Sequence, residues 1–93
     1  MIKSFKNKKL KRFFGEDTAA GLPAGQAQKL ADVLAALDTA EDPSEVGLFP
    51  GWRLHPLKGD LKGFWSITIT GNWRVIFRFA DGDAFDVDLV DYH

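Results

Sequence analysis

The sequence predicts an α+β fold in which two N-terminal helices pack on one face of a twisted, mainly antiparallel sheet. Three observations lead to this prediction. Apolar residues before position 40 recur at helical spacing, and apolar residues from Trp52 onward alternate with polar ones. Turn signals that contain glycine separate the alternating runs, as in antiparallel hairpins. Because each alternating run has one apolar side, the helices should cover one face of the sheet.

The composition predicts a single domain, residues 1–93, in the cytoplasm. The chain is long enough for one modest core, and 45% of its residues are hydrophobic. It has no cysteine, which excludes disulfides and thiolate metal sites and suits a reducing compartment. No apolar run approaches the ~18 residues of a membrane span, and no apolar stretch follows the basic N-terminus as in a secretory signal. We therefore expect no membrane partner.

The first half of the chain predicts a short strand over residues 2–5 and then two helices. The first helix covers residues 7–14, with Asn7 as its N-cap and Gly15 as its stop. A loop follows, and Pro23 fits the first turn of the second helix. The apolar residues that share a helix face are Leu10, Phe13 and Phe14 in the first helix, and Ala27, Leu30, Leu34 and Leu37 in the second.

A loop over residues 40–51 leads into the strand-rich half of the chain. Residues 52–57 alternate, and Pro56 places them at a sheet edge or strand end, because proline cannot donate a ladder hydrogen bond. Three longer runs follow. Their apolar residues share one face: Trp65, Ile67 and Ile69; Trp73, Val75, Phe77 and Phe79; and Phe85, Val87 and Leu89. Trp65 and Trp73 are therefore expected in the core rather than as platforms for bases.

The turns fix the register of the two hairpins. A two-residue turn at Asp81-Gly82 sets Arg78 opposite Phe85 and mixes the two faces, whereas a three-residue loop keeps them apart. We therefore predict three-residue loops at residues 81–83 and 70–72. The expected pairs are Phe79 with Phe85, Phe77 with Val87, Val75 with Leu89, Arg78 with Asp86, Ile67 with Val75 and Trp65 with Phe77. In this register Arg78 forms a surface ion pair.

The second face of the predicted sheet is polar and is expected to be open. Its residues are Ser66, Thr68, Arg74, Ile76, Arg78, Asp86 and Asp88. In the predicted register, the end of the last strand lies beside residues 71–73. The closing residues Asp91, Tyr92 and His93 therefore sit at a sheet corner near Arg74.

The net charge of −1 does not indicate a nucleic-acid partner, but the charge is distributed unevenly. Residues 1–14 carry six positive charges and no acid, and residues 51–78 carry five positive charges and one acid. Two such segments could meet and form one patch for an anionic partner. The alternative is that the lysines only keep a helix soluble.

The residues that can do chemistry suit RNA cleavage better than other reactions. No serine sits in a nucleophile elbow, no glycine-rich phosphate loop is present, and two histidines without close spacing are a weak basis for a metal site. The 2′-hydroxyl of RNA can itself attack the adjacent phosphate, so the protein needs only a base, an acid and cations. The set that could supply them is His55, Lys58, Arg74, Tyr92 and His93. Any sheet protein can carry two histidines and some basic residues, so this set alone is not specific.

Four motifs together resemble the HigB branch of the RelE/ParE toxin superfamily. They are LHPLKG at residues 54–59, GFWSI at 63–67, NWRVIF at 72–77 and the closing DYH at 91–93. The opening MIKSFKNKKLKRFF and the ALDTAEDP of residues 36–43 also resemble that branch. The likeness therefore spans nearly the whole chain.

The resemblance implies a toxin of a type II toxin–antitoxin pair, a ribosome-dependent endonuclease that cuts mRNA in the decoding site. It also implies a partner antitoxin with a helix-turn-helix, through which alone the toxin would meet operator DNA. The site residues that it implies are His55, Asp91, Tyr92 and His93 for catalysis, and Lys58, Arg74 and Asn72 for substrate binding, with no cofactor or metal. His55 and His93 would move protons in an unassigned order, and Lys58 and Arg74 would contact phosphate.

Two other functions fit the same fold. One is a non-enzymatic toxin that poisons DNA gyrase, as in the ParE branch, and the other is an inert relative that only binds an antitoxin. The closing Asp-Tyr-His argues against a pure binder, which does not need two imidazoles and a phenol at one corner. Growth arrest on expression would separate the inert relative from both toxins.

Overall fold

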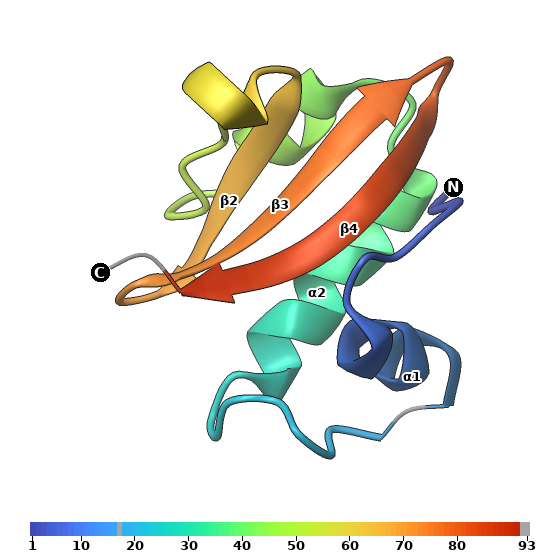
Figure 1. Ribbon diagram of the computed structural model, residues 1–93, viewed down its shortest axis with the longest axis vertical. Helices are drawn as coiled ribbons and strands as arrows, with labels where there is room; N and C mark the ends of the chain where they lie inside the picture. Colours follow the sequence, from blue (N-terminus) through green and yellow to red (C-terminus); the bar gives the residue numbers. More distant parts are fainter. Residues whose placement is uncertain (17, 92–93) are drawn as a thin grey trace.

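The computed structural model describes residues 1–16 and 18–91, and it shows a twisted sheet with helices against one face (Figure 1). The elements are α1 (Lys8–Glu16), α2 (Ala27–Thr39), the 3-10 helix η1 (Pro43–Leu48), β1 (His55–Pro56), the 3-10 helix η2 (Gly59–Leu61), β2 (Phe64–Thr70), β3 (Trp73–Ala80) and β4 (Asp83–Asp91). The strands lie in the order β1-β2-β3-β4, each antiparallel to the next. The predicted α+β fold is confirmed. Among the described residues, neither helix could cross a bilayer.

The N-terminal segment pairs with the outer edge of β4. Ile2 and Phe5 form isolated parallel bridges with Ala84 and Val87, so the predicted short first strand is present only as two bridges and not as a continuous strand. Asn7 caps α1 as predicted, because its side-chain oxygen accepts hydrogen bonds from the backbone N–H groups of residues 9 and 10 at 2.9 and 3.1 Å. This arrangement covers one edge of the sheet and sets α1 beneath it.

The helix ends differ from the prediction. Gly15 is the penultimate residue of α1 rather than its stop, because it does not adopt the left-handed conformation that ends a helix. The second helix begins at Ala27, so Pro23 lies in the preceding loop and not in the first turn. Phe14 is 41% exposed, and its ring lies 5.7 Å from that of Phe5 instead of in the core.

The predicted loop over residues 40–51 contains the 3-10 helix η1. A capping box starts it: Asp42 accepts from the backbone N–H of Ser44 at 2.8 Å, and Glu45 accepts from the backbone N–H of Asp42 at 2.8 Å. The Asp-x-x-Glu spacing that marks a capping box is present in the sequence. Trp52 follows η1, is buried, and stacks on Phe49 with 4.1 Å between ring centroids.

The core lies between the helices and the sheet. Its main residues are Leu10 and Phe13 of α1; Leu30, Val33, Leu34 and Leu37 of α2; and Ile67, Ile69, Val75, Phe77, Val87 and Leu89 of the sheet. Trp65 and Trp73 pack against this cluster, which confirms their assignment to the core. Elements from both halves of the chain share this core.

Both predicted three-residue loops are wrong. The hairpins use two-residue turns at residues 71–72 and 81–82, with Thr70 opposite Trp73 and Ala80 opposite Asp83. Asp81 and Gly82 both have positive φ, 52° and 81°, as in the type I′ turn whose twist matches that of the strands.

Bulges then restore the predicted pairing farther along the strands. Between Ile76 and Arg78 of β3 the register with β4 shifts, and Asp86 takes a left-handed φ of 53°. A second shift lies between Thr68 and Thr70. Beyond these points the structure confirms three predicted pairs: Ile67 with Val75, Trp65 with Phe77, and Val75 with Leu89.

The shifted register changes which residues face outward. Phe85 lies opposite Arg78 on the outer face, and Ala84 takes the buried place opposite Phe79 that the sequence assigned to Phe85. The predicted ion pair is confirmed, with Arg78 Nε 2.8 Å from Asp86 Oδ2.

The outer face is not fully open. Ser66 and Ile76 are 0% and 3% exposed. Both lie on inner strands, where neighbouring strands flank them on each side.

Candidate functional site

The sheet face opposite the helices brings His55 and Arg74 together. Across the sheet, His55 lies opposite Ser66, which lies opposite Ile76, while Arg74 lies opposite Thr68. Directly opposite residues share a face, as do residues two apart on one strand. From ordinary strand spacing, the Cα atoms of His55 and Arg74 are roughly 12 Å apart. Their side chains can therefore meet a ligand that lies between them.

His55 is held in one orientation by the backbone. It is exposed on the edge strand β1, and its Nδ1 lies 2.9 Å from the carbonyl oxygen of Arg53. A carbonyl can only accept, so Nδ1 carries the proton of this hydrogen bond. In the neutral ring, Nε2 is then the nitrogen that can take a proton from a ligand.

Arg53 is a part of this arrangement that sequence reasoning missed. Its φ of 52° places it in the left-handed region, which costs a residue with a side chain roughly 1–3 kcal/mol. Strained backbone of this kind often occurs at functional sites. No motif in the sequence marks the position, because the contribution comes from a carbonyl group.

Arg74 is anchored to the turn between β2 and β3. Its Nη1 donates to the carbonyl oxygens of Gly71 at 2.6 Å and Trp73 at 3.0 Å. The remaining guanidinium donors, Nε and Nη2, are the ones that can bind a phosphate in the fork geometry that arginine favours.

The structure spreads the other predicted substrate-binding residues along the sheet. Asn72 is exposed in the turn beside Arg74, whereas Lys58 is exposed at the start of η2, beyond the opposite end of β2. The backbone N–H of Leu57 donates to the carbonyl oxygen of Phe64 at 2.9 Å, which fixes that end. At ordinary strand rise, the length of β2 separates Asn72 from Lys58 by about 20 Å. The two residues therefore cannot contact the same phosphate.

Asp91 ends β4 at the corner that the sequence predicted. It lies opposite Trp73, one residue from Arg74. Tyr92 and His93 lie outside the described residues, so their part in the site stays a prediction. The sequence also offered a weak possibility that His55 and His93 share a metal, and His93 lies outside the described residues. Within residues 1–16 and 18–91, no three histidine or acidic side chains are placed to hold a metal ion.

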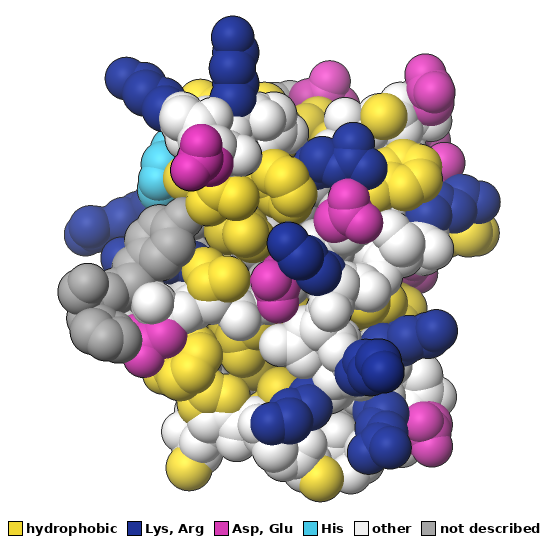
Figure 2. All heavy atoms as spheres, viewed as in Figure 1, with side chains coloured by type: hydrophobic (Ala, Val, Ile, Leu, Met, Phe, Trp, Pro, Cys, Tyr) yellow, Lys and Arg dark blue, Asp and Glu magenta, His cyan; other side chains and the backbone are white. Residues whose placement is uncertain are grey.

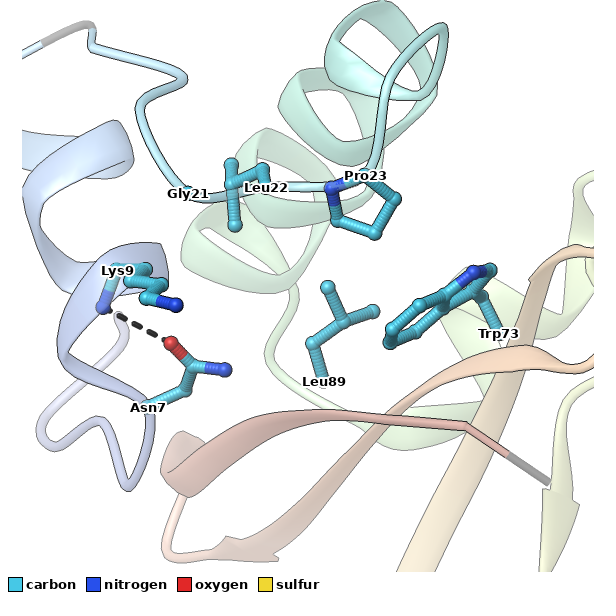
Figure 3. Close-up of a pocket in the computed structure, with 7 residues that line it drawn as sticks. All are labelled: Asn7, Lys9, Gly21, Leu22, Pro23, Trp73 and Leu89. Carbon is cyan, nitrogen blue, oxygen red and sulfur yellow. Dashed lines mark hydrogen bonds between the residues drawn. The ribbon is translucent and has the colours of Figure 1, made fainter.

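A pocket of about 420 Å³ lies on the helix side of the sheet and is separate from this site (Figure 3). Its lining residues are Asn7, Lys9, Gly21, Leu22, Pro23, Trp73 and Leu89. None of the predicted site residues lines it. The exposed site residues His55, Lys58 and Asn72 lie at the surface, where an extended polymer could reach them.

The two basic segments do not merge into one patch. Figure 1 places α1 and η2 at opposite corners of the molecule, and Figure 2 shows lysine and arginine side chains in separate groups with acidic side chains between them. The folding of the sheet separates the segments, because the N-terminal segment forms bridges with β4 at one edge while η2 follows β1 at the other edge. The cations nearest to His55 are therefore those of residues 51–78.

Comparison with known proteins shows the family of the chain. Residues 3–93 match a family described as the RelE-like toxin of type II toxin-antitoxin system HigB. The chain is 46% identical over 93 residues to the Endoribonuclease HigB of Proteus vulgaris, covering 100% of each chain. It is 36% identical over 90 residues to Toxin HigB-1 of Vibrio cholerae serotype O1, covering 96% of this chain and 95% of that protein.

A solved structure shares the fold. The YoeB/ParE toxin from Agrobacterium tumefaciens superposes with a TM-score of 0.58, over 100% of this chain and 99% of that one, at 21% sequence identity. At this identity the likeness shows the fold alone, whereas the sequence matches extend from one end of the chain to the other. The motifs around His55, Arg74 and Asp91 lie within the matched region. The chain therefore belongs to the HigB-like family of toxins from type II toxin–antitoxin systems.

Proposed function

We propose that this chain is an endoribonuclease toxin that cuts mRNA on the translating ribosome. The observation that carries the proposal is the orientation of His55, whose Nδ1 is fixed on the Arg53 carbonyl and whose Nε2 is left for proton transfer on the face that also carries Arg74. The 46% identity to a protein named Endoribonuclease HigB supports the same reaction.

The reaction needs no nucleophile from the protein. The 2′-hydroxyl of the RNA attacks the adjacent phosphorus, and a base removes its proton while the new O–P bond forms. The bond from phosphorus to the 5′-oxygen breaks, and an acid protonates that oxygen. In the proposed assignment His55 Nε2 and His93 perform the two proton transfers, and Arg74 stabilises the charge on the phosphorane.

The remaining residues bind and orient the RNA. Asn72 lies beside Arg74 and can donate to the substrate at the same end of the sheet, while Lys58 contacts phosphate beyond the other end of β2. Tyr92 can transfer a proton or stack on an unpaired base. Asp91, at the end of β4, orients a neighbouring group of the site or accepts a hydrogen bond from the RNA.

The family pairs each toxin with an antitoxin, so an antitoxin is a partner of this chain. We propose that the antitoxin carries a helix-turn-helix and that the toxin meets operator DNA only through it. We also propose that the substrate is mRNA in the decoding site of cytoplasmic ribosomes. The exposure of His55, Lys58 and Asn72 supports this proposal, because a ribosome can present RNA to side chains at the surface.

Primer extension on a reporter mRNA tests the proposal. The wild-type protein is compared with His55→Ala and His93→Ala, each with and without programmed ribosomes. We expect cuts only with ribosomes and only with the wild-type protein. Cuts by the wild-type protein on free RNA would remove the ribosome from the proposal, and unchanged cutting by His93→Ala would remove the terminus from the site.

The same experiment addresses the alternatives. Growth arrest without any RNA cuts would favour a non-enzymatic toxin, and inhibition of DNA gyrase would then be measured. Absence of both growth arrest and cuts would favour a chain that only binds an antitoxin.

A further inference from the structure

A row of three residues crosses the outer face of the sheet two residues along the strands from the Ser66–Ile76 pair that faces His55, on the side away from Arg74. Phe64 of β2 lies opposite Arg78 of β3, which lies opposite Phe85 of β4. All three face away from the core, and the side chain of Arg78 is 50% exposed. The two-residue turn and the bulge at Asp86 put Phe85 on this face instead of in the core.

The guanidinium of Arg78 is held in place from two sides. Its carbon Cζ lies 6.0 Å from the centroid of the Phe85 ring, and its Nε donates to Asp86 Oδ2 at 2.8 Å. Asp86 is itself fixed, because its backbone N–H donates to Ser4 Oγ at 2.8 Å. Among the described residues the ion pair is made through Nε, and the side chain of Arg78 is half exposed, so its two Nη groups can contact a ligand.

This arrangement around Arg78 contributes little to the stability of the fold. An exposed ion pair contributes little to folding, and partly exposed aromatic rings on an outer sheet face leave apolar surface in water. Recognition of single-stranded RNA gives a better reason for the arrangement, because unpaired bases stack on aromatic rings and on arginine guanidinium planes, including those on the open face of a four-stranded sheet.

The position of Arg78 decides which part of an RNA it can meet. It lies on the same strand and face as Arg74, four residues farther along, so their Cα atoms are roughly 13 Å apart. Arg78 therefore cannot share the phosphate that Arg74 contacts. An RNA strand that follows β3 from Arg74 brings a flanking nucleotide to Arg78.

We propose that Arg78, backed by Phe85 and held by Asp86, is a stacking platform for the base of a nucleotide that flanks the cleaved bond. This inference rests on the proposed function, because it gives the same site a second contact with its RNA. It identifies Arg78 and Phe85 as residues that bind substrate without taking part in the proton transfers.

Cleavage of reporter mRNA on programmed ribosomes tests the platform. Arg78→Gln removes the charge and the delocalised plane, Arg78→Lys keeps the charge but removes the plane, and Phe85→Leu removes the support behind it. We expect all three variants to lower kcat/KM by roughly 5- to 150-fold, the range that follows from the loss of one base-stacking contact. Arg12→Gln and Phe14→Leu make the same kinds of change on α1 and should leave cleavage unchanged.

Abasic nucleotides in the mRNA show whether the contact is direct. An abasic site at the contacted flanking position should slow the wild-type protein, and it should add no further loss in Arg78→Gln. Full cleavage by Arg78→Gln and Phe85→Leu, or rescue by Arg78→Lys, overturns the platform. Variants that bind the antitoxin more weakly but cleave at the full rate would show that Arg78 and Phe85 bind the antitoxin, and this result also overturns the platform. If the wild-type protein itself makes no cuts, the proposed endonuclease fails before the platform is tested.

Discussion

The hydrogen bond from His55 to a backbone carbonyl is the single-residue feature on which the proposed chemistry depends. It selects the neutral tautomer with Nε2 unprotonated, and it stops the ring from turning Nδ1 toward the RNA. The sequence predicts the histidine through its motif. It does not predict the carbonyl of Arg53, because no side-chain pattern shows which way a backbone oxygen points.

Replacement of His55 by asparagine separates proton transfer from hydrogen bonding. The amide nitrogen of asparagine can take the place of Nδ1 and donate to Arg53, but the side chain cannot move a proton. We expect His55→Asn to lower the rate of mRNA cleavage by about 10²- to 10⁴-fold, as much as His55→Ala does. The rate is measured by primer extension at saturating ribosomes, with circular dichroism to show that both variants fold. Substantial activity in His55→Asn alone would mean that the residue only holds a hydrogen bond.

Removal of the buried hydroxyl of Ser66 should stabilise the protein. Ser66 is fully buried, and within residues 1–16 and 18–91 its Oγ has no hydrogen-bond partner. An unsatisfied buried polar group costs free energy that an apolar replacement of similar shape avoids. We expect Ser66→Ala to raise the free energy of unfolding by about 1 kcal/mol and Tm by about 4–8 °C. Cleavage should be unchanged, because a fully buried side chain does not touch RNA; a lower Tm would show that the hydroxyl has a partner.

The hairpins show how far element-level prediction reaches. The alternation correctly paired the middles of the strands, because burial of one face fixes the register there. It failed at the turns, because a three-residue loop and a two-residue turn with a bulge give the same pairing beyond the bulge. The Asp81-Gly82 dipeptide favours the second solution through its left-handed turn geometry. The two-residue turn and its bulge place Phe85 on the outer face, beside Arg78.

Two glycine substitutions test the turn geometry against helix propensity. Gly82 has a φ of +81°, so Gly82→Ala should lower the free energy of unfolding by about 1 kcal/mol and Tm by about 4–8 °C. Gly15 lies in α1 with no atom within 4 Å of an added Cβ, so Gly15→Ala should raise stability by roughly 0.5 kcal/mol. Thermal unfolding measures both. Equal Tm shifts of the same sign would contradict the two assigned conformations.

The capping box of η1 makes stability depend on acid pH. The Ser44 hydroxyl and then the Ser44 backbone N–H donate to Asp42, and they lower the pKa of its carboxyl from the ordinary 3.8. A lowered pKa in the folded state contributes stability above the ordinary pKa and loses it as the pH falls through the lowered value. The Tm difference between wild type and Asp42→Asn should therefore shrink below about pH 4. A Tm difference that grows as the pH falls would contradict the lowered pKa of Asp42.

At the scale of the whole molecule, the sequence predicted the fold and the strand corner that holds Asp91, but not the distribution of charge in space. The corner formed by Trp73 and Asp91 follows from strand pairing, which periodicity can predict. Whether two basic segments meet depends on which sheet edge each one joins, and periodicity does not contain that information. The N-terminal segment forms bridges with β4, so α1 and the η2 region lie apart.

This separation predicts that the position of the positive charge, rather than its total, controls cleavage. Lys58→Glu with Lys62→Glu and Lys8→Glu with Lys11→Glu change the net charge equally, but the first pair lies near His55 and the second on α1. Because the Debye length is about 8 Å at physiological salt, reversed charge at α1 is largely screened from the site. We expect the Lys58→Glu, Lys62→Glu variant to lose at least ~10-fold in kcat/KM and a part of the salt dependence of kcat/KM. The Lys8→Glu, Lys11→Glu variant should keep the wild-type kcat/KM and its salt dependence. Rates measured on programmed ribosomes across a salt series check this. A larger loss from the α1 variant would show instead that the N-terminal lysines hold the toxin on ribosomal RNA.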